Sequence, residues 1–351
     1  MFQLIRNLNL KALGIAFVVS SFTIGIIFLG SRDLQYFDAA LITYLFGTIF
    51  AIFGISYRYS VWLQRPPTWM YFKRGMQFFF SGKIFTHIWF VSKASIGNIA
   101  FQKFIYPRGK LKWLAHFFIA AGCLSAFAIT IPLTFGWVHF TLMPETIDTY
   151  QAHFFGFSVF DFKLGSIVAF MTFHALNWSS YLIIIGCLYF LRRRFTNAGL
   201  IASQSFEGDL LPLLLLIIVS VTGLGLTYSY QFMKGFAFNF LAVTHAISVI
   251  IFLIWIPFGK FFHIIQRPAQ IGAHIYKAEG EKQGMAICPH TVKEFSTQLH
   301  IDDLKAVTKE LGFNFDNKDG SSHLDLSPEG KRSALAKAHL NARLESGSFF
   351  G

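Results

Sequence analysis

Two histidines in one apolar segment have a spacing that suits redox chemistry. His245 and His263 lie in segment 238–268, which the apolar run predicts to be one membrane-spanning helix. Their separation of 263 − 245 = 18 residues makes five whole turns, so both imidazoles lie on one face. They are then about 27 Å apart, close to the hydrocarbon thickness of a bilayer. Such a helix could hold two haems across the membrane.

His116 and His174 complete two levels of histidines. His116 stands at the cytoplasmic start of the predicted third span, near the depth of His263. His174 lies 18 residues before Arg192, which gives it the depth of His245. Buried histidines are most often structural, but a polar side chain inside a bilayer is costly and usually functional. We therefore predict two b-type haems (heme b), with His116–His263 and His174–His245 as axial ligands of the iron.

The remaining polar candidates have weaker support. His139 lies 23 residues after His116, about 140° round the helix, which suits an outer-surface position or a quinone pocket. Asp161 and Lys163, at the outer start of the predicted fourth span, could exchange protons with a quinone, although a solvated loop explains them more simply. The other histidines are predicted to be solvated: His87, His153, His274, His290, His300, His323 and His339.

The composition predicts a polytopic membrane protein. The chain has 351 residues, 54% of them hydrophobic and only 14% charged. Its three cysteines form no CxxC pair, so neither an iron–sulfur cluster nor a structural zinc is encoded. Four glycines leave two explanations open, room for a porphyrin or ordinary helix packing; these are Gly122, Gly186, Gly223 and Gly225.

The net charge of +12 is confined to the first part of the chain. Residues 1–270 hold 20 Lys and Arg against 7 Asp and Glu, and residues 271–351 hold 10 against 11. Basic membrane loops account for this excess through the positive-inside rule. No nucleic-acid partner is needed.

Six spans are predicted, and the loop charges orient them. The loop 57–112 carries ten Lys and Arg and no acid, whereas 138–161 carries three acids and no base. We therefore predict that the chain spans the inner (plasma) membrane, with the first loop in the cytoplasm and the second outside. Both termini are then cytoplasmic. The first apolar run lacks a small-residue cleavage site, so it is a retained span. The predicted spans are 10–30, 37–56, 111–137, 162–191, 210–231 and 238–260.

The predicted fold is an all-α membrane bundle with a small cytoplasmic tail. Residues 1–56 form two spans, 57–110 a basic loop, 111–268 a four-helix haem-binding core, and 269–351 the tail. Within the loop, 83–104 is predicted to be an interfacial helix. The tail contains an amphipathic helix at 291–312 and a loop at 314–328, which favours a docking segment for a cytoplasmic partner.

Several segments resemble known membrane cytochromes. THAISVIIFLIWIPFGKFFHIIQRP resembles the last helix of the respiratory nitrate reductase gamma subunit, with its ending at Pro257, Phe258, Lys260, His263 and Pro268. KLKWLAHFFIAAG, which contains His116, looks like that family's first haem helix, and GDLLPLLLLIIVSVTGLGL is similar to its penultimate span. RYSVWLQRPP and QKFIYPRGKLKW resemble cytochrome b subunits of heterodisulfide reductase and sulfite-reduction complexes. The resemblance covers about residues 55–270.

The resemblance implies a function and contains one departure. It implies a di-haem subunit that oxidises quinol near the outer haem and passes electrons to a cytoplasmic iron–sulfur or molybdenum-type partner. Where the family has a second histidine on the first haem helix, this chain has Ala126. His174 is then the replacement ligand that depth suggests.

Two other functions stay open. A secondary transporter normally places carboxylates near the bilayer midplane, and the predicted spans contain essentially none. A haem-free membrane anchor for a cytoplasmic complex would keep the basic loop and the tail, but it would leave the two histidine levels without a purpose.

Overall fold

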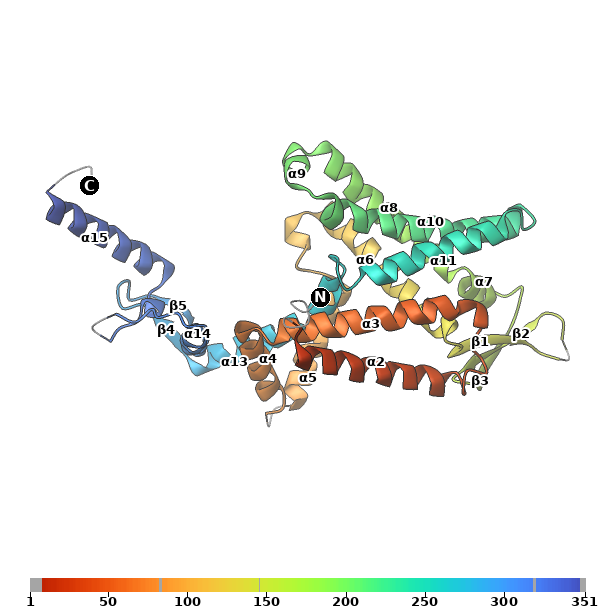
Figure 1. Cartoon of the computed structure of the whole chain (residues 1–351), viewed down its shortest axis with the longest axis horizontal. Helices are drawn as coiled ribbons and strands as arrows, with labels where there is room; N and C mark the ends of the chain where they lie inside the picture. The colour runs from red at the N-terminus through yellow and green to blue at the C-terminus, as the bar shows by residue number, and fades with distance from the viewer. Residues whose placement is uncertain (1–7, 82–83, 145, 318–319, 348–351) are drawn as a thin grey trace. The chain divides into compact units, whose positions relative to one another are not determined.

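The structure is a computed structural model that describes residues 8–81, 84–144, 146–317 and 320–347. Six helices in it are long and apolar enough to cross a membrane, as the sequence predicts. The chain is therefore a multi-pass membrane protein with a mostly α-helical bundle fold (Figure 1). The candidate spans are Leu10–Gly30, Ala39–Leu63, Lys110–Thr134, Ala175–Thr196, Phe206–Phe232 and Phe238–Trp255.

The chain divides into two compact units. The first unit contains residues up to 61 and 96–266, and the second contains 62–95 and the chain from 267 onward. The spans of the first unit are α2 (Leu10–Gly30), η1 (Ala39–Leu41) with α3 (Ile42–Leu63), α6 (Lys110–Thr134), α8 (Ala175–Thr196), η4 (Phe206–Leu210) with α10 (Leu211–Phe232), and α11 (Phe238–Trp255). Its short connecting helices are η2 (Ile96–Ala100), η3 (Tyr106–Arg108) and α9 (Ala198–Ser203).

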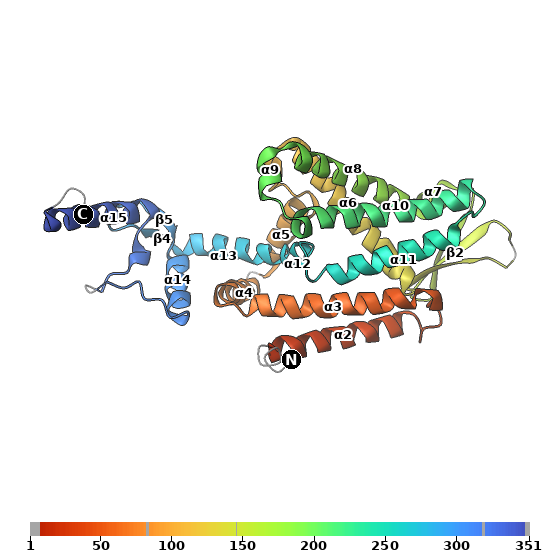
Figure 2. The ribbon, with the colours of Figure 1, turned by 45° about the horizontal axis from the view of Figure 1, so that its top comes forward.

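Helices of the first unit pack in a chain of neighbours. α6 packs on α8, α8 on α10, and α10 on α11, while α2 lies beside α3 in both views (Figures 1 and 2). α3 contributes Ala51 to the apolar core that these helices share. The buried core residues are Ala51, Ile183, Cys187, Leu215, Leu216, Phe252, Leu253, Ile256 and Phe261.

Two glycines set the close approach of α6 and α8. A Cβ atom at Gly122 would lie 2.7 Å from the carbonyl oxygen of Ser179, and one at Gly186 would lie 2.5 Å from that of Ala115. Small residues at such crossings let membrane helices pack backbone to backbone. Of the two explanations that the sequence leaves open for these two glycines, helix packing is what the structure shows.

The helix predicted over 238–268 is broken, and the prediction of one continuous helix that carries both histidines is wrong. α11 ends at Trp255, and the short helix α12 begins only at Phe262 and ends at Gln266. Pro257 lacks an N–H group and its ring clashes with the carbonyl four residues earlier, which ends the helix. His245 and His263 are therefore not related by whole turns of one helix.

α3 stabilises this break. Nη1 of Arg58 donates to the carbonyl oxygens of Pro257 at 2.6 Å and Gly259 at 3.3 Å, two acceptors that a continuous helix would use. The guanidinium also lies over the ring of Phe262, 4.3 Å from its centroid. A Cβ at Gly54 would meet the Pro257 ring at 2.8 Å, so α3 packs directly on the break.

The segment between α6 and α8 forms a small sheet instead of an unstructured loop. Strands β1 (Val138–Leu142), β2 (Thr149–Phe154) and β3 (Phe157–Lys163) form an antiparallel meander in the order β1-β2-β3. Helix α7 (Ile167–Phe173) follows, and the buried residues Ala152, Phe162 and Ala169 join it to the sheet. The fourth span therefore begins at Ala175, and the predicted start at 162 is wrong because β3 alternates apolar and polar residues and pairs with β2.

The turn between α2 and α3 contacts this sheet. Nε of Arg32 donates to the carbonyl of Phe155 at 3.3 Å, and the ring of Tyr36 stacks on His139 with centroids 4.1 Å apart. Both connections therefore lie at the same end of the spans, as the predicted topology requires.

The second unit joins the basic loop to the tail. α4 (Pro66–Phe79) and α5 (Ile84–Ser95) both pack on α13 (Ala269–Gln283). Strands β4 (Met285–Ile287) and β5 (Glu294–Thr297) pair, and α14 (Gln298–Glu310), η5 (His323–Asp325) and α15 (Pro328–Ser346) complete the unit. The basic loop and the tail are predicted as separate segments, because no local sequence pattern shows that they pack together.

An ion pair on the carboxylate of Asp303 links three helices of this unit. Arg74 of α4 binds the carboxylate of Asp303 in α14 with an N–O distance of 2.9 Å, and the hydroxyl of Tyr276 in α13 donates to the same carboxylate at 2.9 Å. Asp303 is buried. Burial and the nearby Asp303 carboxylate raise the pKa of Tyr276, so this hydroxyl remains a donor at neutral pH.

Candidate functional site

His245 is half-buried in the bundle and its protonation pattern is defined by Thr222. The hydroxyl of Thr222 donates to the carbonyl of Ile218 at 2.7 Å, within its own helix. Its oxygen then accepts the Nδ1–H of His245 at 2.9 Å. This tautomer leaves the lone pair on Nε2, the atom that can bind a metal or accept a proton. Gly223 makes room for the ring, since a Cβ there would lie 3.2 Å from Cε1 of His245.

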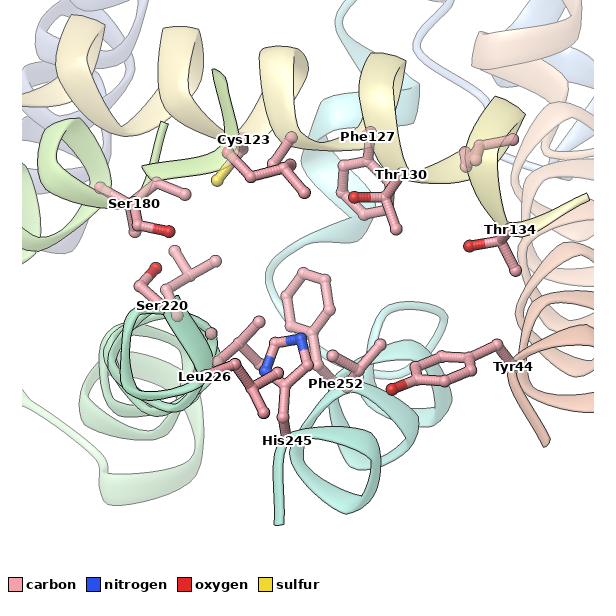
Figure 3. Close-up of a pocket in the computed structure, with 18 of the residues that line it drawn as sticks. Tyr44, Cys123, Phe127, Thr130, Thr134, Ser180, Ser220, Leu226, His245 and Phe252 are labelled. Carbon is pink, nitrogen blue, oxygen red and sulfur yellow. The ribbon is translucent and has the colours of Figure 1, made fainter. Parts of the chain in front are cut away.

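His245 lines a cavity of about 350 Å³ between α3, α6, α8, α10 and α11. Figure 3 shows the imidazole beside the cavity, with the Tyr44 hydroxyl and Thr130 facing the same space. The remaining walls are largely apolar and include Phe127 and Phe252. An apolar cavity with a few convergent polar groups is the usual form of a small-molecule site.

His174 lies at the N-terminal end of α8 and not within it. It forms the junction between α7 and α8, where its Nδ1–H donates to the carbonyl of Phe170 at 2.9 Å. A carbonyl only accepts, so the lone pair is on Nε2, which lies 3.2 Å from the side-chain nitrogen of Gln231.

His174 and His245 form hydrogen bonds at different levels of α10. Their hydrogen-bond partners on α10, Gln231 and Thr222, are nine residues apart, which is about 13 Å along the helix axis. The bond between Asn177 and Thr227, 3.0 Å long, sits between these levels. Two axial ligands face each other across a single iron atom, so this arrangement does not fit the predicted outer haem pair.

His116 and His263 share the end of the bundle where α6 begins and α11 is broken. Nδ1–H of His116 donates to the side-chain oxygen of Gln102 at 2.6 Å, and Nδ1–H of His263 donates to the carbonyl of Lys260. Both rings therefore carry their lone pair on Nε2, as haem ligands do.

A charged cleft of about 450 Å³ surrounds His263. Arg58 and Lys260 line it together with Glu207. At its edge Asp209 binds both Lys260 and Arg194, the latter with an N–O distance of 3.1 Å. The cleft is exposed, and the positive charges of Arg58 and Lys260 are balanced by Glu207 and Asp209.

The three residues predicted for a quinone site lie on the three-stranded sheet. Asp161 and Lys163 are exposed on β3, and the strand register puts them on the same face as His139 and His153. The rings of His139 and His153 stack in parallel with centroids 4.6 Å apart. Neither the cavity beside His245 nor the cleft around His263 is lined by these groups.

Burial holds the pKa of His139 below its ordinary value of 6.5, and the neighbouring His153 lowers it further. Its Nδ1–H donates to the carbonyl of Gly136 at 3.3 Å, so His139 has the same tautomer as the four candidate ligands. A shared tautomer alone therefore does not mark a ligand. A candidate ligand must also lie within or beside the membrane spans.

One histidine predicted to be solvated is buried. His87 is 4% exposed, and its Nε2 lies 3.3 Å from the carboxylate of Glu279 in the second unit. Hydrogen bonding to Lys282, and then to His87, lowers the pKa of Glu279. The prediction for His87 is wrong because α5 turns this residue toward α13, which the sequence could not show.

Sequence reasoning missed the groups that orient the imidazoles. Thr222 stands in the TGLG run and Gln102 in the basic loop, where neither spacing nor residue type distinguishes them. Gln102 is buried although it lies in a connection, and Tyr44 points from α3 to the cavity. An alignment of relatives could have indicated these orienting groups, if it showed a polar residue conserved beside a small one.

Comparisons with models of known families, with curated proteins and with solved structures gave no match for this chain. The resemblance to the nitrate reductase gamma subunit therefore stays a prediction. The fold and site define the class at a coarser level: a six-span membrane protein with imidazoles near both ends of its bundle.

Proposed function

We propose that this chain is a membrane cytochrome b that carries electrons between a quinone pool and a cytoplasmic redox partner. The observation that carries the proposal is the set of four candidate imidazoles in or beside the spans. Each donates Nδ1–H to an oxygen and keeps its Nε2 lone pair. A second hydrogen bond of this kind is what orients a metal-bound imidazole in proteins. Iron–sulfur or molybdenum-type proteins are the proposed partners.

His116 and His263 are the residues that would hold a haem at the cytoplasmic end. Gln102 and the Lys260 carbonyl orient their rings. A bound b-type haem supplies a one-electron carrier close to the cytoplasmic surface. The sequence predicts two haems, but the offset between His174 and His245 favours one.

His245 then has a second role open to it, as the proton acceptor for a quinol. The apolar cavity suits a quinone ring, and Nε2 of His245 carries the lone pair that a quinol hydroxyl needs. Oxidation of one quinol releases two protons and two electrons and leaves the quinone. Nε2 of His245 takes one proton while Thr222 orients the ring, the second proton passes to solvent, and the two electrons leave one at a time to the haem that His116 and His263 would hold. Asp161, Lys163 and His139 remain the earlier quinone candidates, with less support.

Haem content of purified variants tests the cofactor assignment. We expect about one b haem per chain in the reduced-minus-oxidised spectrum, lost in His116→Ala and His263→Ala. His139→Ala is the matched control, because His139 has the same tautomer but lies on the outer sheet. Two haems, with one lost in His174→Ala, would restore the outer pair that the sequence predicts. No haem in any preparation would leave a haem-free membrane anchor or a transporter.

Quinol oxidation tests the role of His245 separately. We expect His245→Ala to slow haem reduction by a quinol analogue while the haem content is kept. Tyr44→Phe, which removes one hydroxyl at the same cavity, should have a smaller effect. Loss of haem in His245→Ala would instead identify His245 as a ligand.

A further inference from the structure

Helix α4 has one buried face and one unpartnered aromatic face. On the buried side, a Cβ at Gly75 would lie 3.4 Å from the backbone of Gly272 in α13, and Arg74 binds Asp303. The opposite side is exposed and follows the helical spacing i, i+3, i+4, i+7, i+11. Its residues are Trp69, Phe72, Lys73, Met76 and Phe80.

Helix α5 repeats this arrangement. His87 faces inward to Glu279 of α13, and the opposite side exposes residues at i, i+3, i+4, i+7 and i+8. Two of them are among the most exposed aromatic side chains of the unit: Phe85 is 85% exposed and Trp89 is 72% exposed. The exposed residues are Phe85, Ile88, Trp89, Ser92 and Lys93. We call the exposed sides of α4 and α5 the aromatic face.

The charge of these helices is strongly one-sided. Residues 62–95 contain five Lys and Arg and no acid, whereas residues 267–351, which pack on them, contain eleven of each sign. The positive charge of the second unit therefore lies on α4, α5 and their connections. Aromatic residues interleaved with Lys and Arg on a helix surface are typical of helices that lie in the headgroup region of a membrane.

A short connection to α3 also keeps the start of α4 close to the bilayer. Only Gln64 and Arg65 separate the end of α3 from the start of α4 at Pro66, and two residues reach about 7 Å at most. Since α3 belongs to a candidate span, α4 begins at the membrane surface.

We propose that the aromatic face is a binding site for the anionic surface of the membrane. Trp69, Phe72, Phe85 and Trp89 insert between headgroups and acyl chains, and the Lys side chains contact lipid phosphates or carboxylates. α13 and α14, packed on the inner side of these helices, are thereby held next to the bilayer. The proposal does not depend on haem or quinone binding.

Spin labels at single cysteines in the full chain, reconstituted in nanodiscs, test this proposal. Labels at Phe72→Cys and Trp89→Cys should be more accessible to oxygen than to a water-soluble nickel chelate. A label at Lys277→Cys, on an exposed side chain of α13, is the matched control and should show the reverse. The background carries replacements of Cys123, Cys187 and Cys288, and gel filtration checks its assembly.

A second measurement keeps the native cysteines. Brominated anionic lipids should quench the tryptophan fluorescence of the native chain more than that of the conservative Trp69→Phe/Trp89→Phe variant. Lys73→Glu/Lys93→Glu should reduce the oxygen accessibility in anionic nanodiscs. Chelate access at positions 72 and 89 equal to that at 277, with quenching unchanged in the Phe variant, would overturn the proposal and leave the face to a protein partner.

Discussion

Single residues in this protein act through the neighbours that orient them. Thr222 decides which nitrogen of His245 keeps its lone pair, and the carbonyls of Phe170 and Lys260 do the same for His174 and His263. In each case the sequence marks the histidine as a candidate but gives no sign of the group that orients its ring. The chemistry of these sites is therefore set by local hydrogen bonds.

His139 gives a pH prediction at this scale. Because burial, and then His153, lowers its folded pKa below 6.5, the unfolded sheet binds more protons in mild acid than the folded one. The stabilisation is therefore fully present above about pH 6.5 and is lost as the pH falls through the folded pKa. Hydrogen exchange in residues 138–163, corrected for the intrinsic pH dependence, should show more opening at acid pH. His139→Gln should remove most of this dependence, and an unchanged profile would contradict the prediction.

Among elements, the crossing of α6 and α8 depends on the absence of side chains. Gly186→Ala places a Cβ 2.5 Å from the Ala115 carbonyl, so the helices must separate, at a cost of about 1–3 kcal/mol in unfolding free energy. Gly14→Ala in α2 is the matched control, since nothing lies within 4 Å of that Cβ and the helix gains propensity. Thermal denaturation in detergent compares the two. Equal stability of both variants would show that the crossing tolerates a methyl group.

The break between α11 and α12 is the second prediction for an element. Arg58→Met keeps the length of the side chain but removes the donors to the carbonyls of Pro257 and Gly259. We expect a loss of about 1 kcal/mol locally and faster hydrogen exchange in residues 256–266. Arg65→Met, on an exposed arginine in the same basic loop, is the control. If exchange at 256–266 is unaffected in Arg58→Met, water satisfies the carbonyls equally well.

For the whole molecule, Asp303 joins the basic loop to the tail. Asp303→Asn preserves the shape but removes the charge that Arg74 and Tyr276 share, and we expect about 1–3 kcal/mol of destabilisation in the second unit. Limited proteolysis between 267 and 347 should then become faster. Asp302→Asn, at the exposed neighbouring residue, should behave as the native chain. Similar proteolysis of both variants would show that apolar packing alone holds loop and tail.

The orientation in the membrane is the second prediction for the whole molecule. The ten basic residues of 57–112 and the acids of 138–161 predict cytoplasmic termini and an outer sheet. A fluorescent protein fused after residue 351 should fluoresce, and a periplasmic reporter inserted between β1 and β2 should be active. A dark fluorescent protein together with an inactive periplasmic reporter would show the inverted topology, with the basic loop and the tail outside.

The sequence by itself determined the features that depend on the summed hydrophobicity of neighbouring residues. Long apolar runs predict six spans, and the structure has six, because transfer to hydrocarbon adds up along a segment. The sequence also contains two local signals that the predictions passed over, because the surrounding residues form a continuous apolar run. Pro257 marks the end of α11, and the alternation in 157–163 marks β3.

Tertiary structure alone decided which groups meet. Thr222 reaches His245 because of the rotation of α10 against α11, whereas His174 bonds to Gln231, nine residues further along α10. Arg74 reaches Asp303 across more than two hundred residues of chain. The depth and rotation of a helix follow from how side chains of distant segments interlock, and that packing has no signature in any single stretch of sequence.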